Sequence, residues 1–209
     1  MNRAKAITFA AIALLFVITA SVAAQADTLN VNFVGVGGEN QNGEYTYPYF
    51  LSINNGPQLA MVCDDYYHTT NFGDQWQANI TSLTSGDLSN TRFNDLNLYE
   101  EASYLLMQMN DGNQAEWGNI NFALWKIMSP SVDLGQAPPG TEGAQYWYDL
   151  ARTTNLSNID FSNVRILTPT DAHSQVGDQE FLFLTPEPGT LALIGSGILG
   201  LYTQRRRFV

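Results

Sequence analysis

The first part of the chain alternates apolar and polar residues with the period of β-strands. Residues 29–34 (LNVNFV) alternate, and a glycine-rich break follows at residues 35–38. Apolar and aromatic runs at residues 45–53 and 58–63 flank the sequence NNGP, which is typical of a tight hairpin turn. Residues 75–83 predict a fourth strand before a loop rich in Gly, Asn and Ser. This part of the chain is therefore predicted to form antiparallel strands.

The middle of the chain changes to a helical period. Apolar residues recur at helical spacing between Leu98 and Met109, and residues 110–113 (NDGN) end that segment. Further helices are predicted over residues 115–128 and 141–153, followed by strands at 163–167 and 180–184. The predicted fold class is α+β: a single globular domain of antiparallel strands with a central helical segment. An N-terminal signal helix and a short C-terminal transmembrane helix would flank this domain, which covers residues 27–184.

The N-terminal end has the composition of a secretory signal. Residues 1–5 are basic, residues 6–22 carry no charge, and residues 24–26 (AQA) place small side chains where a signal peptidase must accommodate them. These features predict a signal peptide over residues 1–26, cut at a site formed by Ala24, Ala26 and Asp27. The alternative, an N-terminal membrane anchor, leaves the AQA sequence unexplained.

The C-terminal end joins a proline-bracketed glutamate, an uncharged stretch and three arginines. The uncharged residues 189–204 would form a helix about 24 Å long, against about 30 Å of hydrocarbon in a bilayer. Arginines beside an apolar segment hold that side in the cytoplasm, so the tail predicts a stop-transfer signal in the inner membrane. The alternative is a C-terminal helix buried in the core. The residues of this signal are Pro186, Glu187 and Pro188, followed by Arg205, Arg206 and Arg207.

Residues 185–209 (TPEPGTLALIGSGILGLYTQRRRFV) resemble the PEP-CTERM protein-sorting domain, with its Pro-Glu-Pro motif, transmembrane helix and arginine-rich tail. The resemblance implies recognition by an exosortase, a membrane-embedded cysteine protease/transpeptidase of Gram-negative bacteria, after a signal peptidase has removed the N-terminal signal. Pro186, Glu187 and Pro188 would be the recognised substrate residues. It also implies an inner-membrane intermediate and delivery to the cell surface or extracellular matrix, in bacteria that make extracellular polysaccharide.

A second resemblance lies within the domain. Residues 62–64 (VCD) and 120–125 (INFALW) resemble the two halves of the bacterial thioester domains of surface adhesins. In those domains a cysteine sulfur bonds to the side-chain carbonyl of a glutamine. Here Asn121 occupies the glutamine position with one methylene fewer, so Cys63 and Asn121 form a possible thioester-like pair. The alternative is that Cys63 is a small buried hydrophobic residue.

The net negative charge of the chain limits the classes of partner that it can bind. Residues 27–185 hold four basic residues against nineteen acidic ones, a net charge near −15. Such a surface repels phosphate backbones, so nucleic acid is excluded as a partner. No EF-hand loop or zinc-ligand spacing is present, and we expect no metal and no cofactor.

Three functions are consistent with these patterns. The favoured hypothesis is a non-enzymatic exported protein with a structural or adhesive role, because the sequence assembles no catalytic residues. The alternative is a carbohydrate-binding module in which Tyr45, Tyr47 and Tyr49 share one face of a strand, although packing in a sheet core would explain the same residues. A secreted hydrolase using Cys63 or a carboxylate pair is the least favoured.

Overall fold

The computed structural model describes residues 28–38, 40–41, 43–174 and 177–185. The predicted signal peptide with its cleavage site lies outside these residues, and so does the predicted sorting signal from Pro186 onward. Within the described ranges, every helix is too short or too polar to serve as a membrane span.

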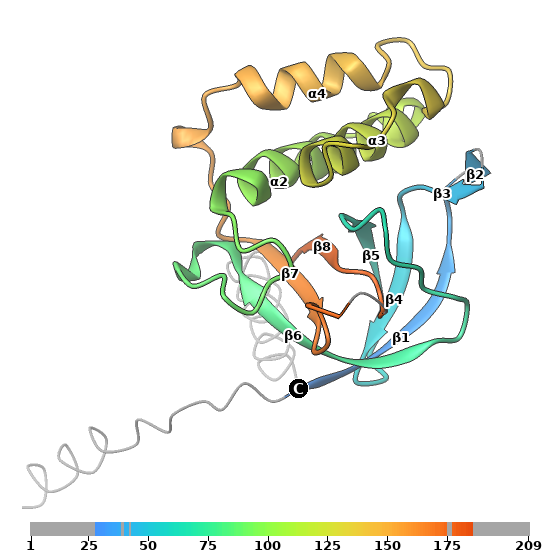
Figure 1. The fold of residues 1–209 in the computed structure, drawn as a ribbon, viewed down its shortest axis with the longest axis vertical. Helices are drawn as coiled ribbons and strands as arrows, with labels where there is room; N and C mark the ends of the chain where they lie inside the picture. Colours follow the sequence, from blue (N-terminus) through green and yellow to red (C-terminus); the bar gives the residue numbers. More distant parts are fainter. Residues whose placement is uncertain (1–27, 39, 42, 175–176, 186–209) are drawn as a thin grey trace, which may run out of the picture.

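Six antiparallel strands of the described chain close into a barrel (Figure 1). The order around the barrel is β1-β4-β5-β8-β7-β6, and β6 pairs back onto β1. Closure leaves these strands without a free edge. The barrel strands are β1 (Leu29–Val36), β4 (Tyr49–Ile53), β5 (Gln58–Cys63), β6 (Gln75–Ser82), β7 (Val164–Pro169) and β8 (Phe181–Leu184). A short ribbon of β2 (Asn40–Gln41) and β3 (Glu44–Tyr45) lies apart from them.

The β4–β5 hairpin forms where the NNGP sequence predicts it. Asn54 and Asn55 have φ values of 51° and 57°, the left-handed conformation that a two-residue hairpin turn requires and that asparagine tolerates. The Asn54 side chain also accepts a hydrogen bond from the Asn30 backbone N–H at 2.9 Å. The turn is therefore tied to the neighbouring strand β1.

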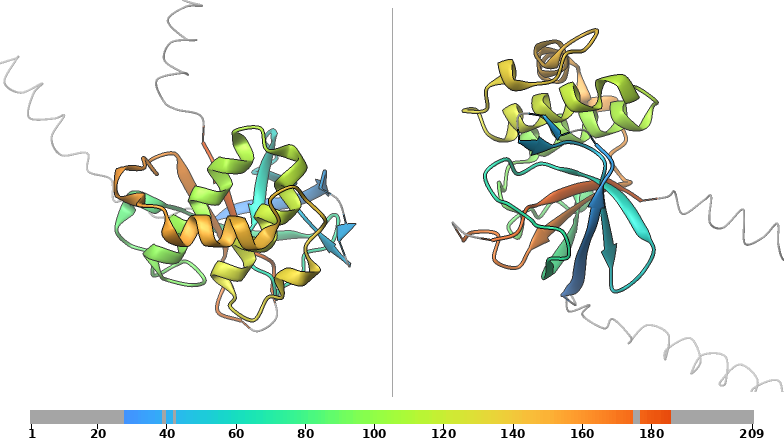
Figure 2. Two further views of the ribbon diagram at one scale, coloured as in Figure 1. Left: turned by 90° about the horizontal axis from the view of Figure 1, so that it is seen from above. Right: turned by 90° about the vertical axis from the view of Figure 1, so that its right-hand side faces the viewer.

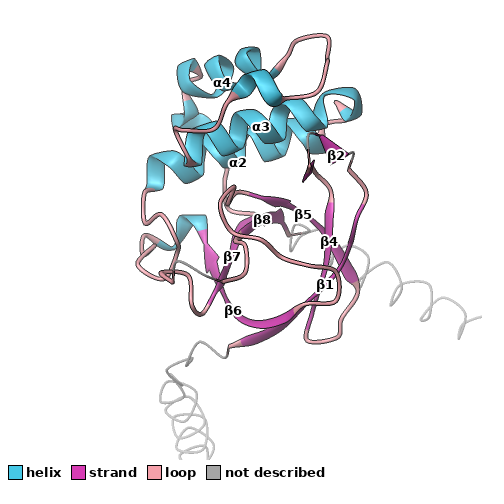
Figure 3. Cartoon of the chain, turned by 45° about the vertical axis from the view of Figure 1, so that its right-hand side comes forward, coloured by secondary structure: helices cyan, strands magenta, loops and turns pink. Residues whose placement is uncertain are grey.

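Three helices form a layer over one side of the barrel (Figures 2 and 3). Asp95 caps the first helix by accepting from the N–H groups of Asn97 and Leu98. The second helix lies between the other two and is buried at nearly every position from residue 119 to 128, whereas the third buries a single narrow face. The helices are α2 (Leu96–Asn110), α3 (Trp117–Met128) and α4 (Ala144–Thr153). Short 3₁₀ turns occupy Leu83–Ser85, Gln114–Glu116, Leu134–Gln136 and Leu156–Asn158.

Two apolar cores result from the alternation of side chains along β5, β7 and β8. Met61, Cys63 and Phe181 belong to the core inside the barrel, while Val62 and Leu182 pack against the helices. Both faces of these strands are thus buried, which explains their nearly continuous apolar sequences.

The predicted strands and helices are confirmed with one exception, and the α+β class is consistent with the structure. The exception is the segment 45–53, which leaves strand conformation at residues 46–48, where Pro48 cannot donate to a strand ladder. The three tyrosines therefore do not share a face: Tyr45 is partly exposed, Tyr47 packs in the helical layer, and Tyr49 lies in the barrel core. The prediction of a single tyrosine row is wrong.

Candidate functional site

A row of polar residues crosses three strands on the face of the barrel that the helices cover. Cys63 pairs with Phe181 and Phe181 pairs with Leu167, so the next positions bring Asp64, Glu180 and Thr168 side by side. Asp64 and Glu180 are fully buried, and so is Thr168. Buried polar groups require partners, and the contacts of this row therefore decide its role.

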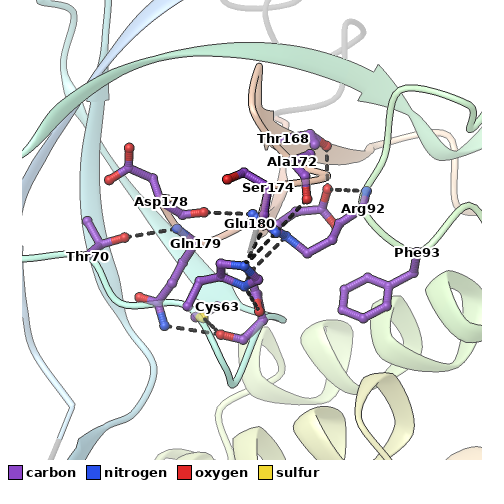
Figure 4. A network of polar contacts seen from close by, with 12 residues as sticks. Cys63, Thr70, Arg92, Phe93, Thr168, Ala172, Ser174, Asp178, Gln179 and Glu180 are labelled. Atoms are coloured by element: carbon purple, nitrogen blue, oxygen red, sulfur yellow. Dashed lines mark hydrogen bonds and ion pairs between the residues drawn. The ribbon is translucent and has the colours of Figure 1, made fainter. Parts of the chain in front are cut away.

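Glu180 is the centre of the row. Its carboxylate accepts hydrogen bonds from the Thr168 hydroxyl at 2.5 Å and from the Arg92 backbone N–H at 2.9 Å (Figure 4). It also accepts one from the Tyr99 hydroxyl of α2. These three donors come from β7, from the loop before α2 and from α2 itself. Burial raises the pKa of Glu180, while the hydrogen bonds from Thr168, Tyr99 and Arg92 oppose that rise.

Asp64 lies beside Glu180 without comparable support. Neither of its carboxyl oxygens has a partner in good hydrogen-bond geometry among the described residues. Burial, and then the negative charges of Glu180 and Asp65, raise the pKa of Asp64 well above its ordinary value. We therefore expect these two neighbouring carboxyl groups to hold one proton between them, which keeps one of them neutral.

Arg92 forms an ion pair with Asp65, the third acid of the cluster, and joins three loops. Its Nε atom lies 2.8 Å from Oδ2 of Asp65, an ion pair rather than a well-aligned hydrogen bond. Its terminal nitrogens donate to the carbonyls of Ala172 at 2.6 Å and Asp178 at 2.8 Å (Figure 4). The guanidinium therefore connects the loop after β5, the loop before α2 and the β7–β8 connection.

His68 completes this cluster, but its ring nitrogens are both engaged. Nδ1 lies 2.9 Å from Oδ1 of Asp65, and Nε2 lies 3.0 Å from the Arg92 guanidinium and 3.2 Å from the Ser174 carbonyl. A general base needs a free lone pair directed at its substrate. Both ring nitrogens of His68 therefore face protein groups, and the Asp65–His68 pair helps to hold the surrounding loops together.

The structure brings the two histidines of the sequence to one open pocket. His68 and His173 both line it, together with Phe93 and Ser129, and its volume is ≈ 450 Å³. No group of three or more His, Cys, Asp or Glu side chains suited to a metal ion occurs among the described residues.

The predicted pair of Cys63 and Asn121 is brought into contact through the cysteine backbone. The Asn121 amide donates to the Cys63 carbonyl at 3.2 Å, and its Oδ1 accepts from the Tyr47 backbone N–H at 2.8 Å. The Cys63 thiol instead donates to the Asp65 carbonyl at 3.2 Å. Burial, followed by the charges of Asp65 and Asp64, raises the pKa of the thiol well above its usual value. Both side chains therefore have non-covalent partners, and the pair joins α3 to β5 and to the segment before β4.

Sequence reasoning missed Arg92, Tyr99 and Glu180, which hold the cluster together. A signal was present for two of them. Arg92 is one of only four basic residues between residues 27 and 185, and Glu180 directly precedes the apolar run FLFL. A charge beside a buried strand indicates a paired buried group.

The fold and this cluster define a helix-covered antiparallel barrel whose buried polar groups bind one another. A family model described as the PEP-CTERM protein-sorting motif matches residues 184–207, so the chain carries that sorting motif at the end of the barrel domain. The matched motif indicates export and processing at a membrane by an exosortase. No curated protein and no solved structure matches the chain.

Replacing Arg92 tests whether the cluster holds the loops together. We expect Arg92→Leu to lower the free energy of unfolding by about 3–5 kcal/mol, because it leaves Asp65 buried without its partner. The control is Arg152→Leu, which removes the exposed pair with Glu101 and should cost less than about 1 kcal/mol. Urea unfolding of both variants measures the difference, and equal losses would contradict this role of Arg92.

Replacing Asp64 tests the shared proton through pH. Because the pKa values of Asp64 and Glu180 are raised, the folded protein holds a proton that the unfolded chain releases. Their contribution to stability is complete below the ordinary carboxyl pKa values and declines as pH rises toward the raised values. Asp64→Asn mimics the protonated acid, so its stability should fall less than that of the wild type as pH rises from about 5 to about 8.

Thermal unfolding across this pH range measures the effect. Asp87→Asn is the control, since Asp87 is exposed and hydrogen bonds from Ser89 lower its pKa. The control variant should lose as much stability between about pH 5 and pH 8 as the wild-type protein does. A shared proton is ruled out if Asp64→Asn follows the wild-type profile.

The contacts of Cys63 predict that no thioester forms. Intact-mass measurement of the purified protein should give the full mass of the chain, without the loss of one ammonia. After denaturation one equivalent of thiol should react with iodoacetamide, and a Cys63→Ala control should take up none. A mass deficit that disappears in Cys63→Ala would show the covalent bond instead.

Proposed function

We propose that this protein is a non-enzymatic structural or adhesive component of the cell surface or extracellular matrix of a Gram-negative bacterium. It would be exported by its N-terminal signal, held in the inner membrane by residues 189–204, and sorted there by an exosortase. The observation that carries the proposal is the PEP-CTERM motif at residues 184–207. The strongly acidic composition of residues 27–185 agrees with a soluble exported domain.

The geometry of the reactive residues supports a role without catalysis. Cys63 and the carboxyl groups of Asp64 and Glu180 are fully buried, and a substrate would have to open the core to reach them. The His68 ring is held between Asp65 and Arg92. A hydrolase that uses Cys63 or a carboxylate pair would need an exposed nucleophile with a positioned base, and these contacts favour packing over such chemistry.

Replacing the Pro-Glu-Pro residues tests the sorting proposal. In the native host we expect the wild-type protein to lose its tail and to leave the inner membrane. A variant with alanine at Pro186, Glu187 and Pro188 should keep its tail and remain in the membrane fraction, because the extended recognition peptide is removed. Mass spectrometry of the protein recovered from each cell fraction identifies both ends of the chain.

The matched control is the wild-type protein in a strain that lacks the exosortase. It should behave like the triple variant, since either change stops the same step. The proposal fails if the wild-type protein keeps its tail in the inner membrane of a strain with an active exosortase.

A further inference from the structure

A pocket beside β1 and β4 combines exposed aromatic rings with hydrogen-bonding side chains. Its volume is ≈ 270 Å³, and its walls come from the β3 end of the small ribbon, from strands β1 and β4, and from the loop that follows β5. The volume is just under the roughly 300 Å³ at which drug-sized sites begin, so the pocket suits a single ring. The lining residues used below are Glu44, Tyr45, Asn71, Phe72 and Gln179.

Phe72 provides a supported flat surface in this pocket. Its side chain is 57% exposed, yet its ring stacks on the buried Phe33 ring with centroids 5.3 Å apart and an interplanar angle of 11°. The Tyr45 ring, itself 39% exposed, lies with its centroid 5.7 Å from that of Phe72 at an interplanar angle of 63°. One face of Phe72 is therefore fixed against the barrel core, and an aromatic ring so supported can receive a second ring on its other face.

The polar side chains around Phe72 are held in place but keep free acceptors. The Gln179 amide nitrogen donates to the Asp65 carbonyl at 3.1 Å, and the Gln179 backbone N–H donates to the Thr70 hydroxyl at 3.0 Å (Figure 4). The Asn71 amide nitrogen donates to Asp74 at 3.2 Å. Within the part of the chain that the structure describes, the side-chain carbonyl oxygens of Gln179 and Asn71 accept no hydrogen bond. They are therefore available to hydroxyl donors of a ligand.

The charge of the pocket selects against anions. Glu44 is the carboxylate that lines it, and no lysine or arginine does. Partial burial raises the pKa of Glu44. His68 also lines the pocket, but its ring lies against Asp65. A phosphate or carboxylate ligand would therefore meet Glu44 without a lysine or arginine to compensate it, whereas a neutral hydroxyl could donate to it.

We propose that this pocket binds one ring of a neutral saccharide. The C–H face of the sugar lies on Phe72, and its hydroxyl groups donate to Asn71, Gln179 and Glu44. A sugar ring has an apolar face and a rim of hydroxyl groups, which matches the aromatic surface and the surrounding acceptors. This site goes beyond the proposed sorting and surface role, which does not require a saccharide.

Affinity electrophoresis of the protein recovered from its exporting host tests the site. Gels containing dextran, galactan or mannan serve as probes, and isothermal titration with glucose, galactose or mannose follows. We expect at least one of these glycans to retard the wild-type protein. Phe72→Leu keeps an apolar contact with Phe33 but loses the aromatic face, and it should weaken binding about tenfold.

Two further variants distinguish sugar binding in the Phe72 pocket from binding elsewhere on the protein. Asn71→Ala removes one acceptor and should also weaken binding, whereas Tyr146→Leu alters an exposed aromatic residue of α4 and should leave binding unchanged. Thermal unfolding of each variant confirms that it is folded.

Each remaining outcome overturns the site. The proposal fails if no probe retards the wild-type protein, or if Phe72→Leu and Asn71→Ala bind as the wild type does. It also fails if choline chloride, an organic cation that aromatic rings bind, occupies the pocket in place of a sugar. The sorting test follows the C-terminal tail and does not depend on sugar binding. A protein that loses its tail but binds no sugar would therefore disprove the saccharide site and leave the sorting proposal intact.

Discussion

The buried carboxylate of Glu180 is the constraint on which the arrangement of barrel and helices depends. It receives donors from Thr168 of β7, Tyr99 of α2 and the backbone of Arg92. A slip of β8 by one residue would turn Glu180 into the barrel interior, away from all three donors. Glu180 therefore selects one register for β8 and one position for α2 above it.

The charges around Glu180 explain why the cluster forms a closed network. Three buried acids, Asp64, Asp65 and Glu180, face a single buried cation, Arg92. The raised pKa values of Asp64 and Glu180 favour their neutral forms, which reduces the excess negative charge, and Arg92 pairs with Asp65. Arginine suits this position better than lysine because its planar fork reaches the carboxylate and two loop carbonyls at once.

The sequence predicted most elements of the fold because their signals are local. The alternation in residues 29–34, the helical spacing from Leu98 to Met109 and the NNGP turn each depend on neighbours within a few residues. Closure of the barrel has no such signal, since it depends on the pairing of β1 with β6, more than forty residues along the chain. The tyrosine row failed for the opposite reason: Pro48 is a local signal that interrupts the strand.

The candidate sites were predictable only where a pattern joined distant residues. The resemblance to thioester domains paired Cys63 with Asn121, and the structure does place the Asn121 amide on the Cys63 carbonyl. Phe72 belongs to no sequence pattern, and Arg92 is marked only by the scarcity of basic residues, because their roles arise when loops after β5 and before α2 meet the barrel. Loops are positioned by tertiary contacts, and single residues in them carry no period.

The described barrel domain and the matched sorting motif overlap at Leu184 and Thr185. Strand β8 ends at Leu184, and Thr185 donates to the Asn163 carbonyl through its backbone N–H at 2.9 Å and its hydroxyl at 3.1 Å. The next residue, Pro186, has no N–H with which to extend a strand ladder. The motif match begins at residue 184, so its first two residues belong to the described barrel domain. A cut within or after the Pro-Glu-Pro sequence would keep the hydrogen bonds of Glu180 and Thr185, because both residues precede it.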